Sequence, residues 1–223
     1  RDQRELARVK RLAEIGQMSA AIAHEIRNPL TGISSAAQFI RDGEENSTEF
    51  LQIIEDEARR LNDLCDEFLA FARPMNLNRD QISLSNSLAT VSKLLSTQFE
   101  EAGVDLKIED STEDGDLISA DKSRIEQVLQ NLLLNGLQAC QNGGVVCVRL
   151  QKNVLTVEDS GVGMTQESMD NLFTPFHTTK PSGTGLGMST VSKIVDAHGA
   201  SIDVQSEVGK GTSIRVTFDG IEA

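Results

Sequence analysis

A histidine, a glutamate and an asparagine lie close together near the start of the chain. His24 and Glu25 are adjacent, and Asn28 follows one helical turn later, directly before Pro29. Neutral imidazole is a competent nucleophile near pH 7, and a carboxylate on its second nitrogen fixes the tautomer and strengthens it. The spacing of four puts His24 and Asn28 on one face of a helix. The segment therefore predicts a nucleophilic histidine, with a surface histidine beside a salt-bridging glutamate as the alternative.

Two asparagines form a second candidate site. Asn131 and Asn135 are four residues apart and therefore share one face of a predicted helix. Carboxamide oxygens are suitable neutral ligands for Mg²⁺, a hard cation that keeps several waters and bridges phosphates. The alternative is a polar edge on an otherwise apolar helix, because buried amides are often merely hydrogen-bonded.

Three glycine-containing segments follow in the second half of the chain. Asp159 ends an apolar strand ahead of Gly161 and Gly163, so its carboxylate can accept a hydrogen bond from an adenine amino group while the glycines let the backbone approach the ring. Residues 183–189 (Gly-Thr-Gly-Leu-Gly-Met-Ser) open a helix whose free amides and dipole favour phosphates. Residues 209–212 read Gly-Lys-Gly-Thr. Each segment alone is compatible with an ordinary turn; together they indicate a nucleotide pocket.

The histidine segment lies in the first of two predicted long helices. From about Arg4 to Ala72, apolar residues recur mostly at steps of three and four on either side of a polar turn at residues 42–47. The turn ends in Ser47, a predicted helix cap, and Pro74 marks the end of the second helix. A lone hairpin cannot bury an apolar stripe on both arms, whereas two copies form a four-helix bundle. We therefore predict a homodimer.

Beyond residue 80 the pattern changes to short strands and helices. Strands are predicted at 104–108, 145–150, 154–158, 201–204 and 213–218, and helices near 85–102, 121–141 and 186–198. This mixture predicts a two-layer α/β sandwich. We expect a helical hairpin domain at residues 1–75 and an α/β domain at 80–223. His198 is predicted to be structural, stabilising the dipole at the end of the last helix.

The composition limits the partners. There are 34 acidic and 21 basic residues, so the net charge of -13 repels a phosphodiester backbone and argues against nucleic acid as a partner. A single nucleotide stays compatible, because backbone amides and a metal ion shield phosphates locally. Cys65, Cys140 and Cys147 lack metal-type spacing and are expected to be free thiols in a reducing compartment.

The order of these segments resembles a known family. Residues 24–30 (His-Glu-Ile-Arg-Asn-Pro-Leu) resemble the H-box of sensor histidine kinases with a HisKA-type dimerisation domain. Segments 131–135, 159–164, 173–176, 183–187 and 209–212 resemble, in order, the N, G1, F, G2 and G3 boxes of the kinase ATP-binding domain, which has the GHKL (Bergerat) fold. The resemblance covers roughly residues 13–218. It implies a two-component kinase core that uses ATP and Mg²⁺ and serves a response regulator.

The resemblance implies roles for the histidine segment. His24 would be the phosphoacceptor, Glu25 its base, and the phosphoryl group would pass on to an aspartate in the regulator's receiver domain. In resembling kinases an Asn or Thr at the position of Asn28 supports dephosphorylation of the regulator. The structural alternative is that Asn28 bonds the backbone carbonyl that Pro29 leaves unpaired.

The resemblance also implies a set of nucleotide contacts. Asp159 would bind adenine with Thr212 near it, and Asn135 would be the direct Mg²⁺ ligand, assisted by Asn131. The lid contains Lys180, which either offsets γ-phosphate charge or is a solvated lysine. The full implied set is Asn131, Asn135, Asp159, Gly161, Gly163, Thr178, Thr179, Lys180, Gly183, Thr184, Gly185, Leu186, Gly187 and Thr212.

One departure from the family pattern concerns the helix with the two asparagines. Many members carry a basic residue and an aromatic after the second asparagine, but residues 136–139 read Gly-Leu-Gln-Ala. This ending and the short lid at 175–180 resemble the nitrogen-regulatory sensor kinases. Two rival functions are a clamp-type ATPase of the gyrase or Hsp90 kind and a non-catalytic scaffold. The clamp-type ATPases use a glutamate where this chain has Asn131, which argues against the first rival. Each of the boxes is intact in this chain, which argues against a non-catalytic scaffold.

The expected location follows from hydropathy. No apolar run approaches the ~20 residues needed to cross a bilayer, and no signal-peptide pattern is present. We expect a cytoplasmic fragment without membrane contact. Since the chain begins at Arg1, we also expect a longer, membrane-anchored sensor from which it derives.

Overall fold

The computed structural model describes residues 2–43, 46–73, 75–112, 117–140, 143–180 and 183–219, with side chains from residue 22 onward. Contacts between residues divide the chain into two compact units. The first holds Arg1–Pro74 together with Pro175–Leu186, and the second holds Met75–Thr174 with Gly187–Ala223. The segment Pro175–Leu186 therefore groups with the N-terminal residues.

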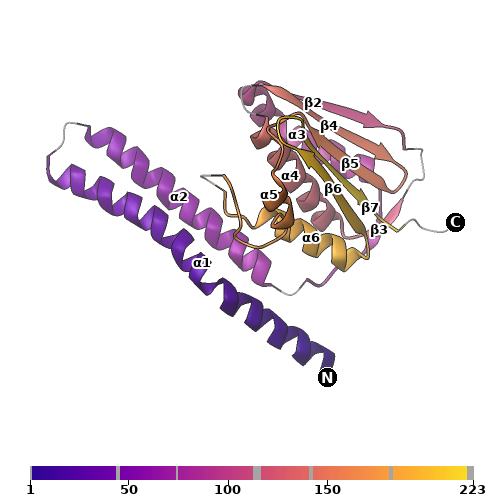
Figure 1. Cartoon of the computed structure of the whole chain (residues 1–223), viewed down its shortest axis with the longest axis horizontal. Coiled ribbons are helices and arrows are strands. Elements are labelled where there is room, and N and C mark those ends of the chain that lie inside the picture. Colours follow the sequence, from indigo (N-terminus) through magenta and orange to yellow (C-terminus); the bar gives the residue numbers. More distant parts are fainter. Residues whose placement is uncertain are drawn as a thin grey trace. The chain divides into compact units, whose positions relative to one another are not determined.

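The first unit contains a helical hairpin. Helix α1 spans Asp2–Arg41 and continues through Pro29, and α2 spans Ser47–Ala72 (Figure 1). Close to the turn, the rings of Phe39 and Phe50 stack with their centroids 5.1 Å apart. The two long helices predicted from the apolar spacing are confirmed.

The ends of α2 differ in detail from the prediction. The predicted cap at Ser47 is wrong, because Ser47 is already helical and Asn46 occupies the cap position without a capping side-chain hydrogen bond. The last turn closes where the backbone N–H of Arg73 donates to the Leu69 carbonyl at 3.1 Å. Pro74, the predicted end marker, lies outside the described residues, as do the side chains of the predicted apolar stripe in the first half of α1.

The second unit is built on a five-stranded sheet. Its strands are β2 (Val104–Asp110), β4 (Gly144–Gln151), β5 (Val154–Asp159), β6 (Ser201–Glu207) and β7 (Gly211–Thr217). Their order is β2-β4-β5-β7-β6, with β2 and β4 parallel and the other pairs antiparallel. Successive side chains point to opposite faces, so Val146 and Val148 are buried while Arg149 is exposed.

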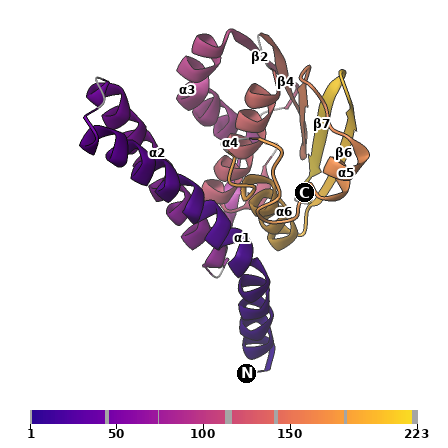
Figure 2. The same cartoon turned by 60° about the vertical axis from the view of Figure 1, so that its left-hand side comes forward.

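Three helices cover one face of this sheet. They are α3 (Leu84–Ala102), α4 (Lys122–Ala139) and α6 (Gly187–His198), and α4 packs between the other two (Figure 2). Ser83 and Asp121 cap α3 and α4 by accepting hydrogen bonds from backbone N–H groups. The core between helices and sheet is aliphatic, with Ile125, Leu129 and Leu133 fully buried. The predicted α/β sandwich is confirmed.

Short elements escaped the sequence prediction. Strands β1 (Asp80–Ile82) and β3 (Ile118–Ala120) form a separate antiparallel pair, and α5 spans Gln166–Asp170. Elements of three to five residues are too short for a hydrophobic period to reveal them.

His198 ties the end of α6 to the start of α4. Its side chain is buried, Nδ1 lies 2.7 Å from the Ile194 carbonyl, and Nε2 lies 3.0 Å from the backbone nitrogen of Asp121. Because Asp121 donates to Nε2, the ring is neutral with its proton on Nδ1. Burial lowers the pKa of His198 in agreement. The predicted structural role stands, but the ring acts as a neutral hydrogen-bond bridge rather than as a cation on the dipole.

Two further expectations concern the whole chain. Among the described helices, none has a stretch long and apolar enough to cross a membrane.

Cys65, Cys140 and Cys147 are free thiols, as predicted.

Candidate functional site

The imidazole of His24 stands exposed on α1 with two polar neighbours. The side chain is 68% exposed, and Glu25 Oε1 lies 4.0 Å from Nδ1. The carboxamide nitrogen of Asn28 lies 3.5 Å from the same Nδ1. Among the described residues, nothing is hydrogen-bonded to Nε2. The structure therefore brings the three predicted residues together and directs both neighbours to one ring nitrogen.

This arrangement favours a nucleophilic Nε2. With its proton on Nδ1, facing the Glu25 carboxylate, the imidazole keeps the lone pair on Nε2 for attack. The Asn28 carboxamide can present oxygen or nitrogen to Nδ1 and so is compatible with either tautomer. Within the described part of the chain Asn28 contacts His24 rather than the backbone carbonyl freed by Pro29.

The two asparagines of α4 emerge from the core at its edge. Asn131 and Asn135 are half-buried, whereas Leu132 and Leu133 between them are fully buried. The Asn131 amide nitrogen donates to the Gln127 carbonyl at 3.0 Å, which fixes the carboxamide and leaves its oxygen turned outward. This anchoring gives Asn131 a defined acceptor at the edge of the helix.

That acceptor lies beside the first residue of α6. A Cβ added to Gly187 would come within 3.0 Å of Asn131 Oδ1, so the oxygen faces the start of the helix. Backbone N–H groups at the start of a helix favour phosphate, and a carboxamide oxygen is a suitable ligand for Mg²⁺. No cluster of three or more His, Cys, Asp or Glu side chains suited to a metal occurs in the described ranges. The carboxamide oxygens of Asn131 and Asn135 are donors of the kind that Mg²⁺ accepts.

The loop after β5 is held by close backbone contacts. Asp159 Oδ1 accepts a hydrogen bond of 2.9 Å from the Gly161 N–H, and the Val162 N–H donates to the Ala139 carbonyl at 3.2 Å. Gly163 has a positive φ of 65°, and a Cβ there would overlap the Glu207 carbonyl oxygen. The loop therefore lies directly on the end of β6, at a distance that only glycine allows.

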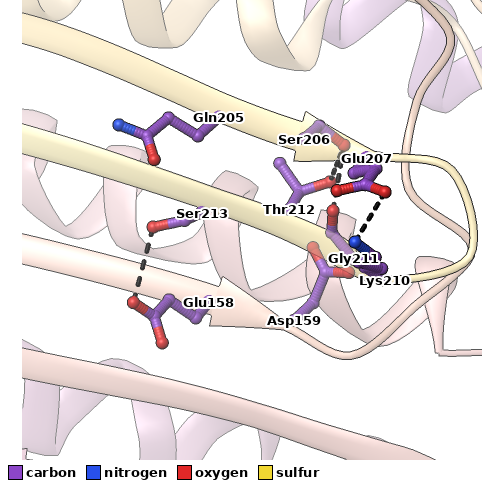
Figure 3. Close-up of a pocket in the computed structure, with 9 residues that line it drawn as sticks. All are labelled: Glu158, Asp159, Gln205, Ser206, Glu207, Lys210, Gly211, Thr212 and Ser213. Atoms are coloured by element: carbon purple, nitrogen blue, oxygen red, sulfur yellow. Dashed lines mark hydrogen bonds and ion pairs between the residues drawn. The ribbon is translucent and has the colours of Figure 1, made fainter.

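A pocket of about 340 Å³ opens where β5 and β6 end and β7 begins. Figure 3 shows its lining residues, with Asp159 and Thr212 on neighbouring strands. These two are paired in register across β5 and β7. The rim carries an ion pair of 2.7 Å between Lys210 and Glu207. The predicted adenine contact and its predicted neighbour therefore meet in one pocket.

The predicted lid residues form a compact loop within the first unit. The Phe176 N–H donates to the Gly185 carbonyl at 3.1 Å, and the Lys180 N–H donates to the Thr178 hydroxyl at 3.0 Å. The Thr184 hydroxyl donates to the carboxylate of Glu67. Desolvation raises the pKa of Glu67 and the Thr184 hydrogen bond opposes this rise.

The other predicted lid contacts divide between the units. Thr179, Gly183 and Leu186 lie in the loop of the first unit, and Gly187 lies in the second. The structure thus gathers the predicted residues into four groups: the histidine cluster, the α4–α6 corner, the β5–β7 pocket and the lid loop.

Comparisons with known proteins match both parts of the chain. Residues 14–76 match the His Kinase A (phospho-acceptor) domain, and residues 120–221 match the histidine kinase-, DNA gyrase B- and HSP90-like ATPases. These two domains in this order make up one known architecture. The chain is a histidine kinase core.

The relatives of this kinase core are sensor kinases. It is 36% identical to sporulation kinase D of Bacillus subtilis over 94% of this chain and 42% of that protein. It is 35% identical to the sensor histidine kinase ZraS of Salmonella typhimurium over 92% of this chain and 46% of that protein. The core thus spans less than half the length of these curated relatives.

A solved histidine kinase structure has a similar fold over most of the length of this chain. The histidine kinase ThkA, crystallised in complex with the response regulator protein TrrA, matches with a TM-score of 0.80 and 28% identity. The match covers 97% of this chain and 65% of ThkA.

Sequence reasoning missed one polar residue of the kinase core. Ser206 lies on β6, where Ile202, Val204 and Ser206 alternate with exposed residues and share one face. Its hydroxyl contacts Thr212 Oγ1 at 2.9 Å beside the pocket. The available signal was a serine at a position where the strand's alternation predicts an apolar side chain.

Proposed function

We propose that this kinase core transfers the γ-phosphoryl group of ATP to His24 and then to an aspartate of a response regulator. The observation that carries the proposal is the His24 cluster, in which Glu25 and Asn28 both approach Nδ1 and Nε2 stays exposed. Its position in a HisKA domain that is followed by an ATPase domain supports the same reaction.

The chemistry at His24 is a nucleophilic substitution. Nε2 forms a bond to the γ-phosphorus as the bond to the β,γ-bridging oxygen breaks, and ADP leaves. The phosphorylated ring is at first an imidazolium. Its Nδ1 proton is hydrogen-bonded by the Glu25 carboxylate or transferred to it, and this offsets the positive charge of the phosphohistidine. Most of the rate comes from in-line positioning and charge neutralisation, as in other phosphoryl transfers.

The α/β unit would bind the nucleotide. Asp159 would accept from the adenine amino group with Thr212 beside it, and the amides near Gly187 would receive phosphates. Asn135 would hold Mg²⁺ directly and Asn131 would assist, the oxygen of Asn131 facing the start of α6. When bound, Mg²⁺ supplies positive charge that offsets the phosphates.

The lid loop belongs to the same proposal. Thr178, Thr179, Lys180 and the segment Gly183–Leu186 would close over the phosphates. Lys180 would offset the γ-phosphate charge.

We propose a homodimer and a receiver domain as the protein partners. The hairpin exposes large apolar side chains on one face of α2, where Leu51 and Leu69 are each 52% exposed. Their burial between two copies would complete a four-helix bundle. The complex of the similar kinase ThkA with TrrA supports a response regulator as the second partner.

Three finer proposals concern Asn28, the kinase subgroup and the location. Asn28 would hold a water against the aspartyl phosphate of a docked regulator and so support its dephosphorylation. The Gln138-Ala139 ending and the short lid support membership of the nitrogen-regulatory subgroup. We also propose a cytoplasmic location, because the proposed substrate ATP and the proposed partner, a response regulator, are found in the cytoplasm.

The test of the main proposal is labelling with γ-labelled ATP and Mg²⁺. We expect wild-type protein to gain label that is acid-labile and alkali-stable, as a phosphoramidate bond is. His24→Gln should remove the label completely while nucleotide affinity stays within about twofold, because the substitution is on α1 and not in the α/β unit. Label retained by His24→Gln would contradict the assignment of the acceptor.

A further inference from the structure

Ser206 joins three separate groups beside the proposed adenine pocket. Its hydroxyl oxygen lies 3.0 Å from the Gly211 carbonyl oxygen and 2.9 Å from Thr212 Oγ1 (Figure 3). The same oxygen lies 2.9 Å from the backbone nitrogen of Met164. Met164 belongs to the loop after β5, and Gly211 and Thr212 begin β7. One side chain of β6 therefore connects the loop after β5 to the start of β7.

The direction of these hydrogen bonds follows from proton counting. A serine hydroxyl has one proton to donate and two lone pairs to accept with. An amide N–H can only donate and a carbonyl oxygen can only accept, so Ser206 accepts from Met164 and donates to Gly211. Its second lone pair then remains for Thr212, whose hydroxyl must be the donor. This is the arrangement that satisfies all three contacts at once.

These hydrogen-bond directions decide whether the Thr212 hydroxyl can donate to a ligand or only accept from it. Since its proton points to Ser206, Thr212 Oγ1 offers only lone pairs to a ligand. Asp159, its partner in register across β5 and β7, is an acceptor too, with Oδ1 already receiving the Gly161 N–H. Both residues line the same pocket. This end of the pocket therefore presents acceptors, and the ligand must supply the protons.

The backbone leaves this arrangement little freedom to shift. Gly211 has a positive φ of 104°, and a Cβ there would overlap the Asp159 carbonyl oxygen. The start of β7 is thus pressed against the end of β5, and Gly163 presses the loop against β6 in the same way. The backbone that carries Thr212 is therefore closely packed between these strands.

We propose that Ser206 is a specificity-determining positioning residue, which sets the Thr212 hydroxyl as an acceptor and so favours a 6-amino purine over a 6-oxo purine. The inference rests on the proposed function, since it takes the pocket as the purine site. Adenine presents an amino donor toward these acceptors, directly or through a water. Hypoxanthine presents a carbonyl oxygen there and meets acceptor with acceptor, which leaves a polar group unpaired.

The experiment compares the dissociation constants of ATP and inosine triphosphate for the full chain in the presence of Mg²⁺. Wild-type protein should prefer ATP. In Ser206→Ala the Thr212 proton is released and can be donated to the 6-oxo group, so the ATP preference should fall by about 5- to 10-fold, the range for one hydrogen bond. Ser206→Thr keeps the hydroxyl and should restore most of the preference.

Two further variants protect the test. Thr212→Val removes the acceptor itself and should also reduce the preference, even if Ser206→Ala fails to fold. Ser201→Ala is the matched control, because Ser201 is an exposed serine at the other end of the same strand β6 and is not among the residues that line the pocket. It should leave the preference unchanged.

The possible outcomes distinguish the role of Ser206 from the existence of the nucleotide site. A wild-type preference for ATP that survives unchanged in both Ser206→Ala and Thr212→Val overturns the role of Ser206 and leaves the proposed kinase function intact. Failure of wild-type protein to bind either nucleotide overturns the nucleotide site and the inference together. A preference that falls in Ser206→Ala and returns in Ser206→Thr supports both.

Discussion

At the scale of single residues, the His24 cluster separates two tasks on one ring. Glu25 and Asn28 both contact Nδ1, so Nε2 is left for the phosphoryl group. The Glu25 carboxylate can accept the Nδ1 proton of the imidazole. Asn28 carries no charge, so it can only form hydrogen bonds, for example to a water. The two neighbours should therefore affect different reactions.

Replacing Asn28 with Ala should leave His24 phosphorylation within about twofold of wild type but slow regulator dephosphorylation by about tenfold or more, as expected for loss of one positioning group. The measurement mixes the purified cognate regulator, phosphorylated beforehand and freed of ATP, with each variant. Gln38→Ala is the control, because Gln38 is another exposed amide of α1. Equal phosphate loss with wild type and Asn28→Ala would remove Asn28 from this step.

A second residue prediction concerns the metal. Asn135→Ala should weaken Mg²⁺-dependent ATP binding by about tenfold or more. The substitution removes a proposed protein ligand, and Mg²⁺ is usually held by only one or two protein groups in addition to waters and phosphates. Calorimetric titration with and without Mg²⁺ measures this. Gln130→Ala, an exposed amide on the same helix α4, should bind normally. If Asn135→Ala keeps full Mg²⁺ dependence, the proposed ligand is wrong.

At the scale of elements, His198 shows how α6 is attached to α4. The neutral ring accepts from the Asp121 N–H and donates to the Ile194 carbonyl. Burial alone would raise the pKa of Asp121, but hydrogen bonds from Asn78, Ser123 and Arg124 together lower it. The corner between β3, α4 and α6 therefore depends on a neutral histidine beside an ionised aspartate.

This bridge predicts a pH dependence of stability. Burial lowers the pKa of His198, so the unfolded chain binds that proton more readily than the folded one. The stabilisation is complete above the ordinary histidine pKa of about 6.5 and is lost as the pH falls below it, at up to about 1.4 kcal/mol per pH unit. Urea unfolding at pH 7.5 and 5.5 measures the loss.

His198→Leu is the comparison for that loss. The variant should be less stable at pH 7.5 but should lose less on going to pH 5.5, and the difference from wild type cancels the other titrating groups. Asp121 does not interfere, because its lowered pKa places its own loss well below this range. Parallel pH dependences for the two proteins would contradict the assignment.

At the scale of the whole molecule, the two units have different needs. The α/β unit closes its own core between sheet and helices, whereas the hairpin leaves Leu51 and Leu69, which are about five helical turns apart on one face of α2, each 52% exposed. Such a stripe is stable in water when a second copy covers it. We therefore expect the hairpin to be the part that sets the oligomeric state.

Light scattering should give the mass of a dimer for the full chain. Leu51→Asp should weaken the dimer by at least about tenfold, because it would bury a charge in the bundle. Leu94→Asp is the matched control, since Leu94 on α3 is 66% exposed and belongs to the other unit. A monomeric wild-type mass, or equal weakening by both substitutions, would contradict assembly through the hairpin.

Local patterns were enough to predict much of this protein from its sequence. The two helical stripes, the five main strands and three main helices follow from periods of 3.6 and 2, which each segment carries within itself. The histidine cluster was also predictable, because its members lie within five consecutive positions of one helix. Ser47 shows the limit of such signals, since the end of an element depends on details that a pattern does not specify.

The tertiary structure decided which distant residues meet. Asn131 faces Gly187, His198 bridges to Asp121, and Ser206 directs Thr212. Each contact joins elements whose approach depends on strand register and on helix packing over the sheet. These are cooperative properties of the assembled core, so no local pattern encodes them. The sequence alone thus determined which chemical groups are available, and only the fold determined which of them share a site and which way their protons point.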